Sequence, residues 1–511
     1  MRDIKESLAW GALARLLSYA SSCVIVLLLT PIMVGRLGET GFGFWSLIGS
    51  LIGISTFFDL GISSSLKRFL PLYEVRGEKE KYYQTVIISF SIFCACSFVF
   101  LLFAFLLRHI IFNKFAQGIA PETFLFVYSV VATDFAIQLP MRVVVGFLES
   151  KLEYDSLAFV ELGKAITRGA GIYGVLRYGM GLEAVASVCL GANLLGHAFL
   201  LLYFRRRHWH TIGNKQFRAF STEILPELLS YSWINLLGSF TDILRFRMDD
   251  FVISRFLGLS LVTPYAIAMK LVNYFIEFIS VIMGQTVPVF SKFDALGNRK
   301  SLLIAFTMLT KISTALSVYV GGVLIIFGKP FLDRWLGYPG KEAYPVLVIL
   351  SVAFVLALAQ YPMGNLMRGM SRHGILLFCN LIEGVANLVL SLLLVQRYGI
   401  LGVAIGTAVP MVISKLLLQP YLFCKLVRLT TFNSYYRNIF GPPLITSIVL
   451  VVICWALLIP FLKATYPALF LGVIATTPYF IVFYWLVFSK EEKINYFQPL
   501  YAQLSHRFFE K

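Results

Sequence analysis

The stretch SFTDILRFRMDDFVISRFLG, Ser239–Gly258, ends a long apolar run that begins near Leu225. Besides Arg255 near its end, it holds five ionisable side chains where a membrane helix is normally apolar: Asp242, Arg245, Arg247, Asp249 and Asp250. Ionisable groups inside a bilayer are costly, so they mark a pathway or a binding site unless they neutralise one another. Both readings stay open, because Arg245 with Asp249 and Arg247 with Asp250 have spacings that meet on one helix face.

The composition around this stretch is that of a membrane protein. Of the 511 residues, 58% are hydrophobic and only 14% are charged, and the mean hydropathy is +0.78. The apolar runs are continuous over about 20 residues rather than alternating, which predicts helices and not strands. The fold class is therefore an all-α polytopic membrane protein.

About fourteen apolar runs are long enough to span a bilayer, and short loops separate them. We expect spans near residues 8–34, 41–66, 84–107, 122–148, 153–176, 182–204, 225–256, 260–288, 301–327, 343–367, 374–396, 401–424, 440–462 and 467–489.

The basic residues indicate the orientation of these spans. The net charge is +17. With both termini inside, about 25 Lys and Arg fall in inner loops and tails and about 10 in outer loops, which predicts cytoplasmic termini in the inner (cytoplasmic) membrane. Basic residues scattered through short loops do not form a nucleic-acid surface, so no nucleic-acid partner is expected. The seven cysteines lie in apolar spans without zinc spacing, so no metal site is expected either.

The two halves of the chain resemble each other at a constant offset. Arg177-Tyr178-Gly179 recurs 220 residues later as Arg397-Tyr398-Gly399, and Gly38 and Gly77 recur as Gly258 and Gly297. Each copy holds six spans, an even number, so the copies run in the same direction as in parallel transporter repeats. We expect a first six-helix lobe at 1–204, a basic cytoplasmic linker at 205–224, a second six-helix lobe at 225–428, and two further helices with a cytoplasmic tail at 429–511.

Four segments carry a resemblance to a known family. They are PIMVGRLGETGFGFWSLIGSLIGISTFFDLGISSSLKRFLPLY (Pro31–Tyr73), TDILRFRMDDFVISRFLG followed by Tyr265-Ala266, PMGNLMRGMSRHG (Pro362–Gly374) and RYGILGVAIGT (Arg397–Thr407). They resemble bacterial polysaccharide transporters, the O-antigen (Wzx-type) oligosaccharide-lipid flippases of the multidrug/oligosaccharidyl-lipid/polysaccharide exporter superfamily.

The resemblance implies a fold and a function. Two six-helix lobes would form a V around a central cavity. By alternating access, the protein would turn undecaprenyl-diphosphate-linked oligosaccharide from the cytoplasmic to the periplasmic leaflet, for O-antigen, capsule or exopolysaccharide synthesis. Its expected partners are that glycan lipid, membrane lipid, a polysaccharide polymerase and a chain-length regulator, and we expect a monomer. No phosphate-binding loop GxxxxGK[ST] occurs, so we expect a secondary transporter without cofactors, coupled to H⁺ or Na⁺, and not an enzyme.

Charged residues within the spans are the candidate site. Arg offers a diphosphate a bidentate fork and Lys a point charge. The candidates for binding substrate in the central cavity are Arg142, Lys164, Arg168, Arg245, Arg247, Lys270 and Lys311. The candidates for coupling or gating are Asp59, Asp242, Asp249, Asp250 and Glu277.

Two other functions compete. A multidrug or toxin cation antiporter of the same superfamily would need an acidic or apolar cavity, and the slight excess of bases within the spans favours an anionic substrate instead. A membrane glycosyltransferase or polymerase would need a large loop or catalytic domain. No loop between the expected spans is longer than about 20 residues, which is short for that role.

Overall fold

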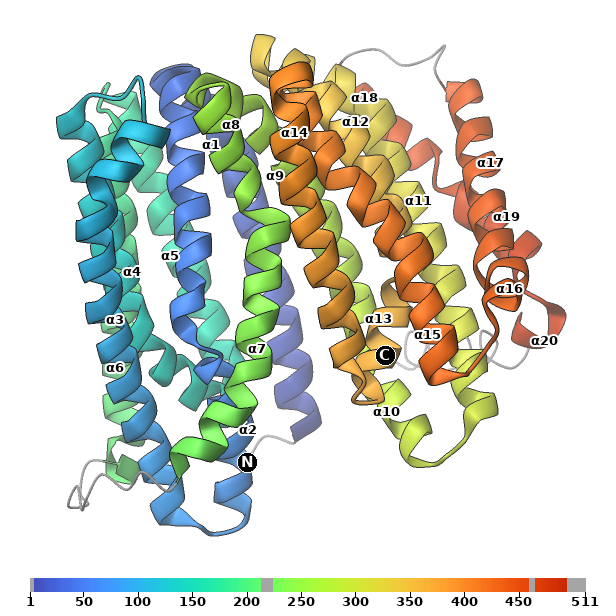
Figure 1. Ribbon diagram of the computed structural model, residues 1–511, viewed down its shortest axis with the longest axis horizontal. Helices are drawn as coiled ribbons and strands as arrows, with labels where there is room; N and C mark the ends of the chain where they lie inside the picture. Colours follow the sequence, from blue (N-terminus) through green and yellow to red (C-terminus); the bar gives the residue numbers. More distant parts are fainter. Residues whose placement is uncertain (1–3, 213–223, 459–464, 494–511) are drawn as a thin grey trace, which may run out of the picture. The chain divides into compact units, whose positions relative to one another are not determined.

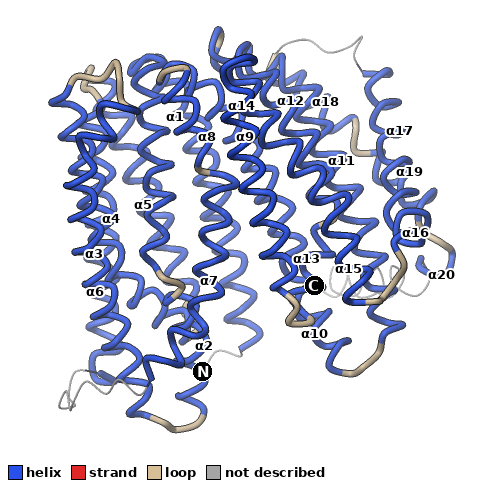
Figure 2. The backbone as a smooth tube through the Cα atoms, in the orientation of Figure 1, coloured by secondary structure: helices blue, strands red, loops and turns tan. Residues whose placement is uncertain are grey.

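The computed structural model describes residues 4–212, 224–458 and 465–493, and regular structure in these ranges is helical, with short connecting loops (Figure 2). Segments η1 and η3 are 3-10 helices, and η4 and η5 are π-helices. The elements are α1 (Ile4–Ser55), η1 (Thr56–Asp59), α2 (Ile62–Val75), α3 (Lys79–Phe115), α4 (Pro121–Ser150), α5 (Tyr154–Arg177), α6 (Leu182–Ile212), α7 (Leu225–Phe246), α8 (Met248–Phe256), α9 (Leu259–Met283), η3 (Gly284–Thr286), α10 (Val287–Ala295), α11 (Arg299–Leu336), α12 (Tyr338–Ala359), α13 (Tyr361–Gly369), α14 (His373–Ile413), η4 (Ser414–Leu418), α15 (Gln419–Val427), α16 (Phe432–Ser434), η5 (Tyr435–Phe440), α17 (Gly441–Leu458), α18 (Tyr466–Ala475), α19 (Pro478–Val487) and α20 (Lys490–Glu492).

The expected membrane spans correspond to these helices. Ten helical stretches of the described chain are long and apolar enough to cross a bilayer. Two of them, Ala20–Asp59 and His373–Val427, bend at Gly38 and Gly399, and each covers two expected spans. The remaining two expected spans coincide with α5 and with α7 and α8, whose charged side chains keep their hydropathy low. The all-α polytopic fold is confirmed.

The internal repeat is visible in the backbone. Gly38 and Gly258 have φ of 72° and 94°, and Gly179 and Gly399 have φ of 76° and 58°. A positive φ is easy for glycine and costly for other residues, which explains why glycine stands at these turns in both copies. Helix starts repeat as well, because α3 begins at Lys79 and α11 at Arg299, 220 residues later. The internal repeat predicted from the sequence is therefore confirmed.

The chain forms two compact units, which we describe separately. The first comprises Met1–Ala266 with Leu388–Val403, and the second Ile267–Asn387 with Ala404–Lys511. The charged span α7–α8 thus packs with the first six expected spans: the hydroxyls of Ser65 on α2 and Ser232 on α7 are 2.9 Å apart. Of the expected linker 205–224, the first part continues α6 to Ile212, and 213–223 lie outside the described residues, as do 494–511 of the tail. The division into functional lobes stays a prediction.

Within the first unit, α1 packs on α5, α3 on α4, and α6 on both α4 and α5 (Figure 1). Glycines permit these close contacts: a β-carbon at Gly169 would lie 2.6 Å from Ile25, and one at Gly171 would lie 2.5 Å from Val188. The core between the helices is aromatic, and Phe44 and Phe124 are buried in it. Small residues at helix contacts and large side chains between them are typical of membrane bundles.

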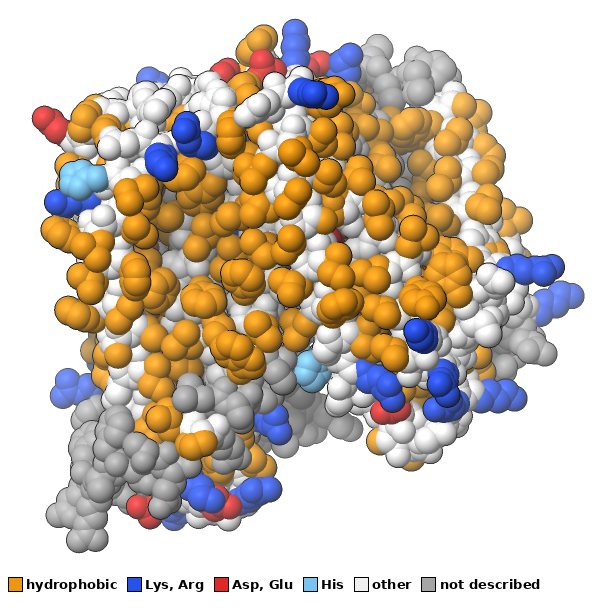
Figure 3. Space-filling model, in the orientation of Figure 1, with side chains coloured by type: hydrophobic (Ala, Val, Ile, Leu, Met, Phe, Trp, Pro, Cys, Tyr) orange, Lys and Arg blue, Asp and Glu red, His pale blue; other side chains and the backbone are white. Residues whose placement is uncertain are grey.

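The second unit follows the same rules. Its most extensive contact joins α11 and α12, where Gly321 faces Val355 at 2.0 Å from an added β-carbon. Phe290, Phe306 and Tyr435 are buried in a hydrophobic cluster of this unit. On the face that Figure 3 shows, hydrophobic side chains cover the middle of the helices, and Lys and Arg lie mostly near helix ends, as expected for a surface in contact with lipid.

Candidate functional site

The expected span 225–256 is not one continuous helix. It is broken within its charged part, at Arg247. Helix α7 ends at Phe246 and α8 begins at Met248, with Arg247 between them at φ −116° and ψ −19°. The expectation of one continuous helix here was wrong. Arg245 forms an ion pair with Asp242, three residues before it, at 3.6 Å. The pairing of Arg247 with Asp250 expected from helical spacing is replaced by contacts of Asp250 with α1.

The two adjacent acids of α8 bind hydroxyl groups. Asp250 Oδ2 accepts hydrogen bonds from Ser50 at 2.6 Å and from Ser46 at 3.3 Å, both on α1 and one helical turn apart. Asp249, which is buried, accepts a hydrogen bond from the Tyr265 hydroxyl. These carboxylates therefore fasten α8 to α1 and to the start of α9. Three common residue types, Asp, Ser and Tyr, form this network because α8 packs against both α1 and α9.

Arg247 lies against the backbone of α1. A β-carbon on Gly53 would come within 2.4 Å of Arg247 Nε and 2.8 Å of Cζ, so glycine at this position is what lets the guanidinium approach. The Arg247 residue is nevertheless exposed. Asp250 is close enough to interact with it electrostatically, without a direct ion pair among the described contacts. Arg247 thus presents a positioned guanidinium whose donors are available to an anion.

A second arginine, Arg142, contacts the chain at Asp59, six residues after Gly53. Arg142 on α4 forms an ion pair with Asp59 of η1, and its guanidinium carbon lies 6.0 Å from the centre of the Phe135 ring. Asp59 Oδ1 also accepts the backbone N–H of Ser63 at 3.0 Å. The structure therefore brings Arg142 and Arg247 to opposite ends of the short segment 53–59, which sequence spacing alone does not show.

The basic stripe of α5 lies on α6. Lys164 pairs with Glu161, and its alkyl chain crosses α6 at Gly196, where a β-carbon would lie 2.5 Å from Lys164 Cδ. Lys164 also lines a cavity of about 220 Å³ between α5 and α6. Arg168, one turn later, is exposed. The stripe predicted from the spacing of these residues is present. One of its two bases, Lys164, already forms an ion pair with Glu161.

The structure reveals a buried polar layer beside this stripe that the predicted site set did not include. Asp134 on α4 is 8% exposed, and its Oδ2 accepts hydrogen bonds from Asn193 at 2.7 Å and Gln138 at 3.0 Å. Asp134 Oδ1 and both ring nitrogens of His197 have no hydrogen-bond partner within the described residues. A buried polar atom without a partner is costly. The sequence signal was an acid in one apolar span, with an Asn and a His four residues apart in another.

Three candidates belong to the second unit. Lys270 on α9 is half-buried, and Glu277, seven residues later, is exposed. Lys311 on α11 binds both carboxylate oxygens of Glu492 at 2.8 Å, and the carbonyl of Val487 at 3.2 Å. Its charge therefore fastens the end of the described chain to α11, a role that its sequence position did not suggest.

The second unit also contains an acid–base cluster inside the membrane region. Lys415 Nζ lies 3.0 Å from both Asn380 Oδ1 and Gln419 Oε1, and 3.6 Å from Glu383 Oε2. Glu383 is 2% exposed, so this is a buried pair with polar support. In the part of the chain that the structure describes, no three His, Cys, Asp or Glu residues are grouped to hold a metal ion.

Comparison with known proteins adds independent information. Residues 7–294, more than half of the chain, match the family described as polysaccharide biosynthesis protein. The "Putative O-antigen transporter" of Shigella flexneri is 24% identical over 434 residues, covering 82% of this chain and 97% of its own. The "Uncharacterized membrane protein EpsK" of Bacillus subtilis (strain 168) is 20% identical over 490 residues, 94% of this chain and 95% of its own.

Solved structures show the same fold. The lipid II flippase MurJ, in an inward closed conformation, has a TM-score of 0.72 at 15% identity, covering 95% of this chain and 99% of its own. An inward-facing multidrug resistance transporter of the MATE family, within the MOP superfamily, has a TM-score of 0.67 at 15% identity, covering 82% and 98%. At this identity the similarity establishes the architecture and leaves the substrate open.

Proposed function

Because the chain belongs to the polysaccharide biosynthesis protein family, we propose that it is a flippase for undecaprenyl-diphosphate-linked oligosaccharide repeat units. It moves them from the cytoplasmic to the periplasmic or outer leaflet by alternating access. The family match and the flippase fold support a membrane transporter, and the relative in Shigella is named for O-antigen transport. The protein sits in the cytoplasmic membrane with both termini inside, as the distribution of Lys and Arg predicts.

The observation that carries the proposal is the exposed, positioned guanidinium of Arg247. Gly53 lets it approach α1, and the serine-bound Asp250 nearby does not neutralise it by direct contact. An arginine in this setting recognises a diphosphate by charge and by paired hydrogen bonds. Arg142, Lys164, Arg168 and Arg245 add positive charge in the same unit, each balanced differently by neighbouring acids. Lys270 is the corresponding candidate in the second unit, and Lys311 is left out because Glu492 holds its ammonium.

Neighbouring acidic side chains partly offset the positive charge of these basic residues. A site that held the diphosphate with unopposed arginines would release it slowly, since buried charge-assisted pairs are strong. Asp59, Asp242, Asp249 and Asp250 supply alternative hydrogen-bond acceptors or counter-charges, and we expect their partners to change between conformations. A ligand shifts such an equilibrium only by binding one state better than the other. Coupling to H⁺ or Na⁺ through these acids or through Glu277 is part of the proposal.

The test is genetic and biochemical. Deletion of the gene in cells that make the corresponding surface glycan should cause lipid-linked repeat units to accumulate on the cytoplasmic face, and wild-type protein should restore export. Arg247→Ala should restore it poorly at equal expression, whereas Arg255→Ala, at an exposed arginine near the end of α8, should restore it fully. Normal export in the deletion strain, or loss of resistance to cationic drugs in its place, would contradict the proposal and favour the exporter.

A further inference from the structure

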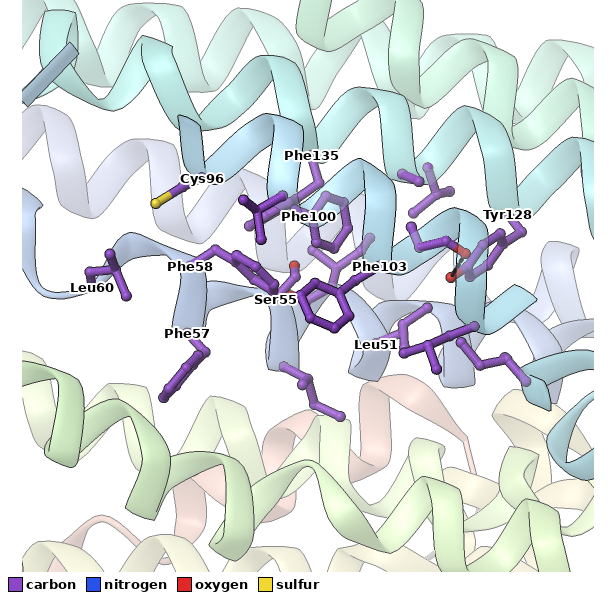
Figure 4. A pocket seen from close by; sticks show the side chains of 18 of the residues that line it. Leu51, Ser55, Phe57, Phe58, Leu60, Cys96, Phe100, Phe103, Tyr128 and Phe135 are labelled. Carbon is purple, nitrogen blue, oxygen red and sulfur yellow. Dashed lines mark hydrogen bonds between the residues drawn. The ribbon is translucent and has the colours of Figure 1, made fainter. Parts of the chain in front are cut away.

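A long apolar groove of about 640 Å³ runs through the first unit, bounded by the end of α1 with η1 and by α3 and α4 (Figure 4). Five phenylalanine rings dominate its wall, and Phe58 packs edge-on to Phe100 with ring centres 5.3 Å apart. Its two hydroxyl groups already donate to backbone carbonyls, Ser55 to Ile52 at 2.6 Å and Tyr128 to Ala104 at 3.0 Å. The groove therefore offers almost nothing to a sugar and suits a hydrocarbon.

The dimensions of the groove suit a chain rather than a compact ligand. Its lining positions on α3 extend from Ile92 to Ile111. Nineteen helical steps span about 28 Å, close to the thickness of a bilayer's hydrocarbon core. Val99, Phe103 and Leu107 along this line are 40%, 50% and 41% exposed, so the groove opens sideways. An occupant can enter from the lipid without passing through the protein.

One end of the groove carries charge. In Figure 4, Leu60 and Cys96 mark this end and Tyr128 lies towards the other. Asp59 lies between two lining residues, Phe58 and Leu60, and forms an ion pair with Arg142. The guanidinium of Arg142 lies over the ring of Phe135, which belongs to the groove wall. A guanidinium has five N–H donors, so Arg142 can bind Asp59 and a phosphate oxygen together. An apolar track with an arginine beside one of its wall residues is complementary to a lipid with a phosphorylated head and a long tail.

We propose that this groove holds the polyprenyl tail of the lipid-linked glycan, with the diphosphate at the segment 53–59, whose two ends meet Arg247 and Arg142. The inference rests on the proposed function and assigns a place to the part of the substrate that the charged residues cannot recognise. The Arg142 end lies towards the Lys151 end of α4, which the positive-inside rule places at the cytoplasm. A lipid in this orientation has its head towards the leaflet from which the substrate is taken.

Photocrosslinking of the full-length protein in phosphatidylethanolamine/phosphatidylglycerol nanodiscs tests the proposal. The probe is a polyprenyl diphosphate with a benzophenone at the end of its tail, and labelled peptides are identified by mass spectrometry. We expect labels on α3 and on α1, competed by unlabelled undecaprenyl diphosphate and not by phosphatidylglycerol. Val99→Trp and Leu107→Trp fill the groove and should each lower labelling about tenfold, which corresponds to about 1.4 kcal/mol. Phe98→Trp and Leu106→Trp, adjacent positions on α3 outside the groove wall, are the controls.

The outcomes separate the two proposals. If the probe labels the protein elsewhere and the groove-filling variants label and export like wild type, the groove assignment is wrong and the flippase function stands. If a phosphatidylglycerol probe labels the groove equally well, the occupant is ordinary bilayer lipid and the assignment is also wrong. If wild type shows no preference for polyprenyl diphosphate at any site, the proposed function itself fails. Two groove variants are used so that misfolding of one leaves the test intact.

Discussion

Arg247 lies against Gly53. Because glycine has no side chain, the guanidinium of Arg247 can approach the backbone of α1 at this position. An added β-carbon on Gly53 would lie 2.4 Å from Arg247 Nε. The two residues are almost 200 positions apart in the sequence. Arg247 is the residue immediately before α8, and Gly53 belongs to α1. Since the guanidinium is exposed and held against α1, this contact links helix packing to the proposed recognition of substrate.

Gly53→Ala should therefore displace Arg247 and lower glycan export about tenfold, because a methyl group at this distance requires the guanidinium to move away from α1. Gly49→Ala, one turn earlier on the same helix, is the matched control, since nothing lies within 4 Å of its added β-carbon. Export is measured as surface glycan at equal membrane expression. Equal export by both variants would show that the position of Arg247 is unimportant.

The Arg142–Asp59 pair separates stability from transport. Arg142→Gln leaves a partly buried carboxylate without its partner and should destabilise the protein by about 3 kcal/mol, as should Asp59→Asn for the opposite reason. The double variant removes both charges and should recover most of that loss in a thermal unfolding assay of purified protein. Export should stay low in the double variant if Arg142 contacts the diphosphate. Recovery of export together with stability would show a purely structural pair.

Asp134 is a case where function and stability should oppose each other. One of its oxygens is buried without a hydrogen-bond partner, so Asp134→Asn removes a buried charge while keeping the acceptor for Asn193 and Gln138. We expect thermal stability to rise by about 1 kcal/mol, and export to fall if this carboxylate is used in transport. Glu122→Gln, at an exposed carboxylate on the same helix, is the control and should leave stability unchanged. Unfolding temperature and surface glycan report the two effects.

The Lys311–Glu492 contact should respond to acid. Burial disfavours the charged form of Glu492, but hydrogen bonds from Lys311 and from the backbone of Ser489 outweigh this and lower the pKa of the carboxyl below its usual value. A lowered folded-state pKa means that the carboxylate stabilises the fold above its unfolded-state pKa, and that this contribution is lost as pH falls through the folded-state value. Wild type should thus lose thermal stability below about pH 4.5 more steeply than Glu492→Gln. Glu80→Gln, at an exposed carboxylate, should behave like wild type.

The membrane fold was predictable from composition and periodicity. Apolar runs of bilayer length and glycines at a constant offset reflect local chemistry: hydrocarbon demands satisfied backbone groups, and turns in both copies demand positive φ at Gly38 and Gly258. The break at Arg247 was not predictable, because a continuous helix also accommodates that sequence. At this break, Asp250 binds Ser46 and Ser50 of α1, and Arg247 lies against Gly53 of the same helix.

By itself, the sequence determined that this chain spans a membrane with helices, that its halves repeat in parallel, and that charged residues lie within its spans. Only the tertiary structure decided which of those charges meet. Lys311 binds Glu492 near the other end of the chain, Arg142 binds Asp59, and the apolar groove arises where α1, α3 and α4 diverge. The physical reason is that hydropathy acts on each residue separately, whereas an ion pair or a cavity depends on the distance between residues from different helices.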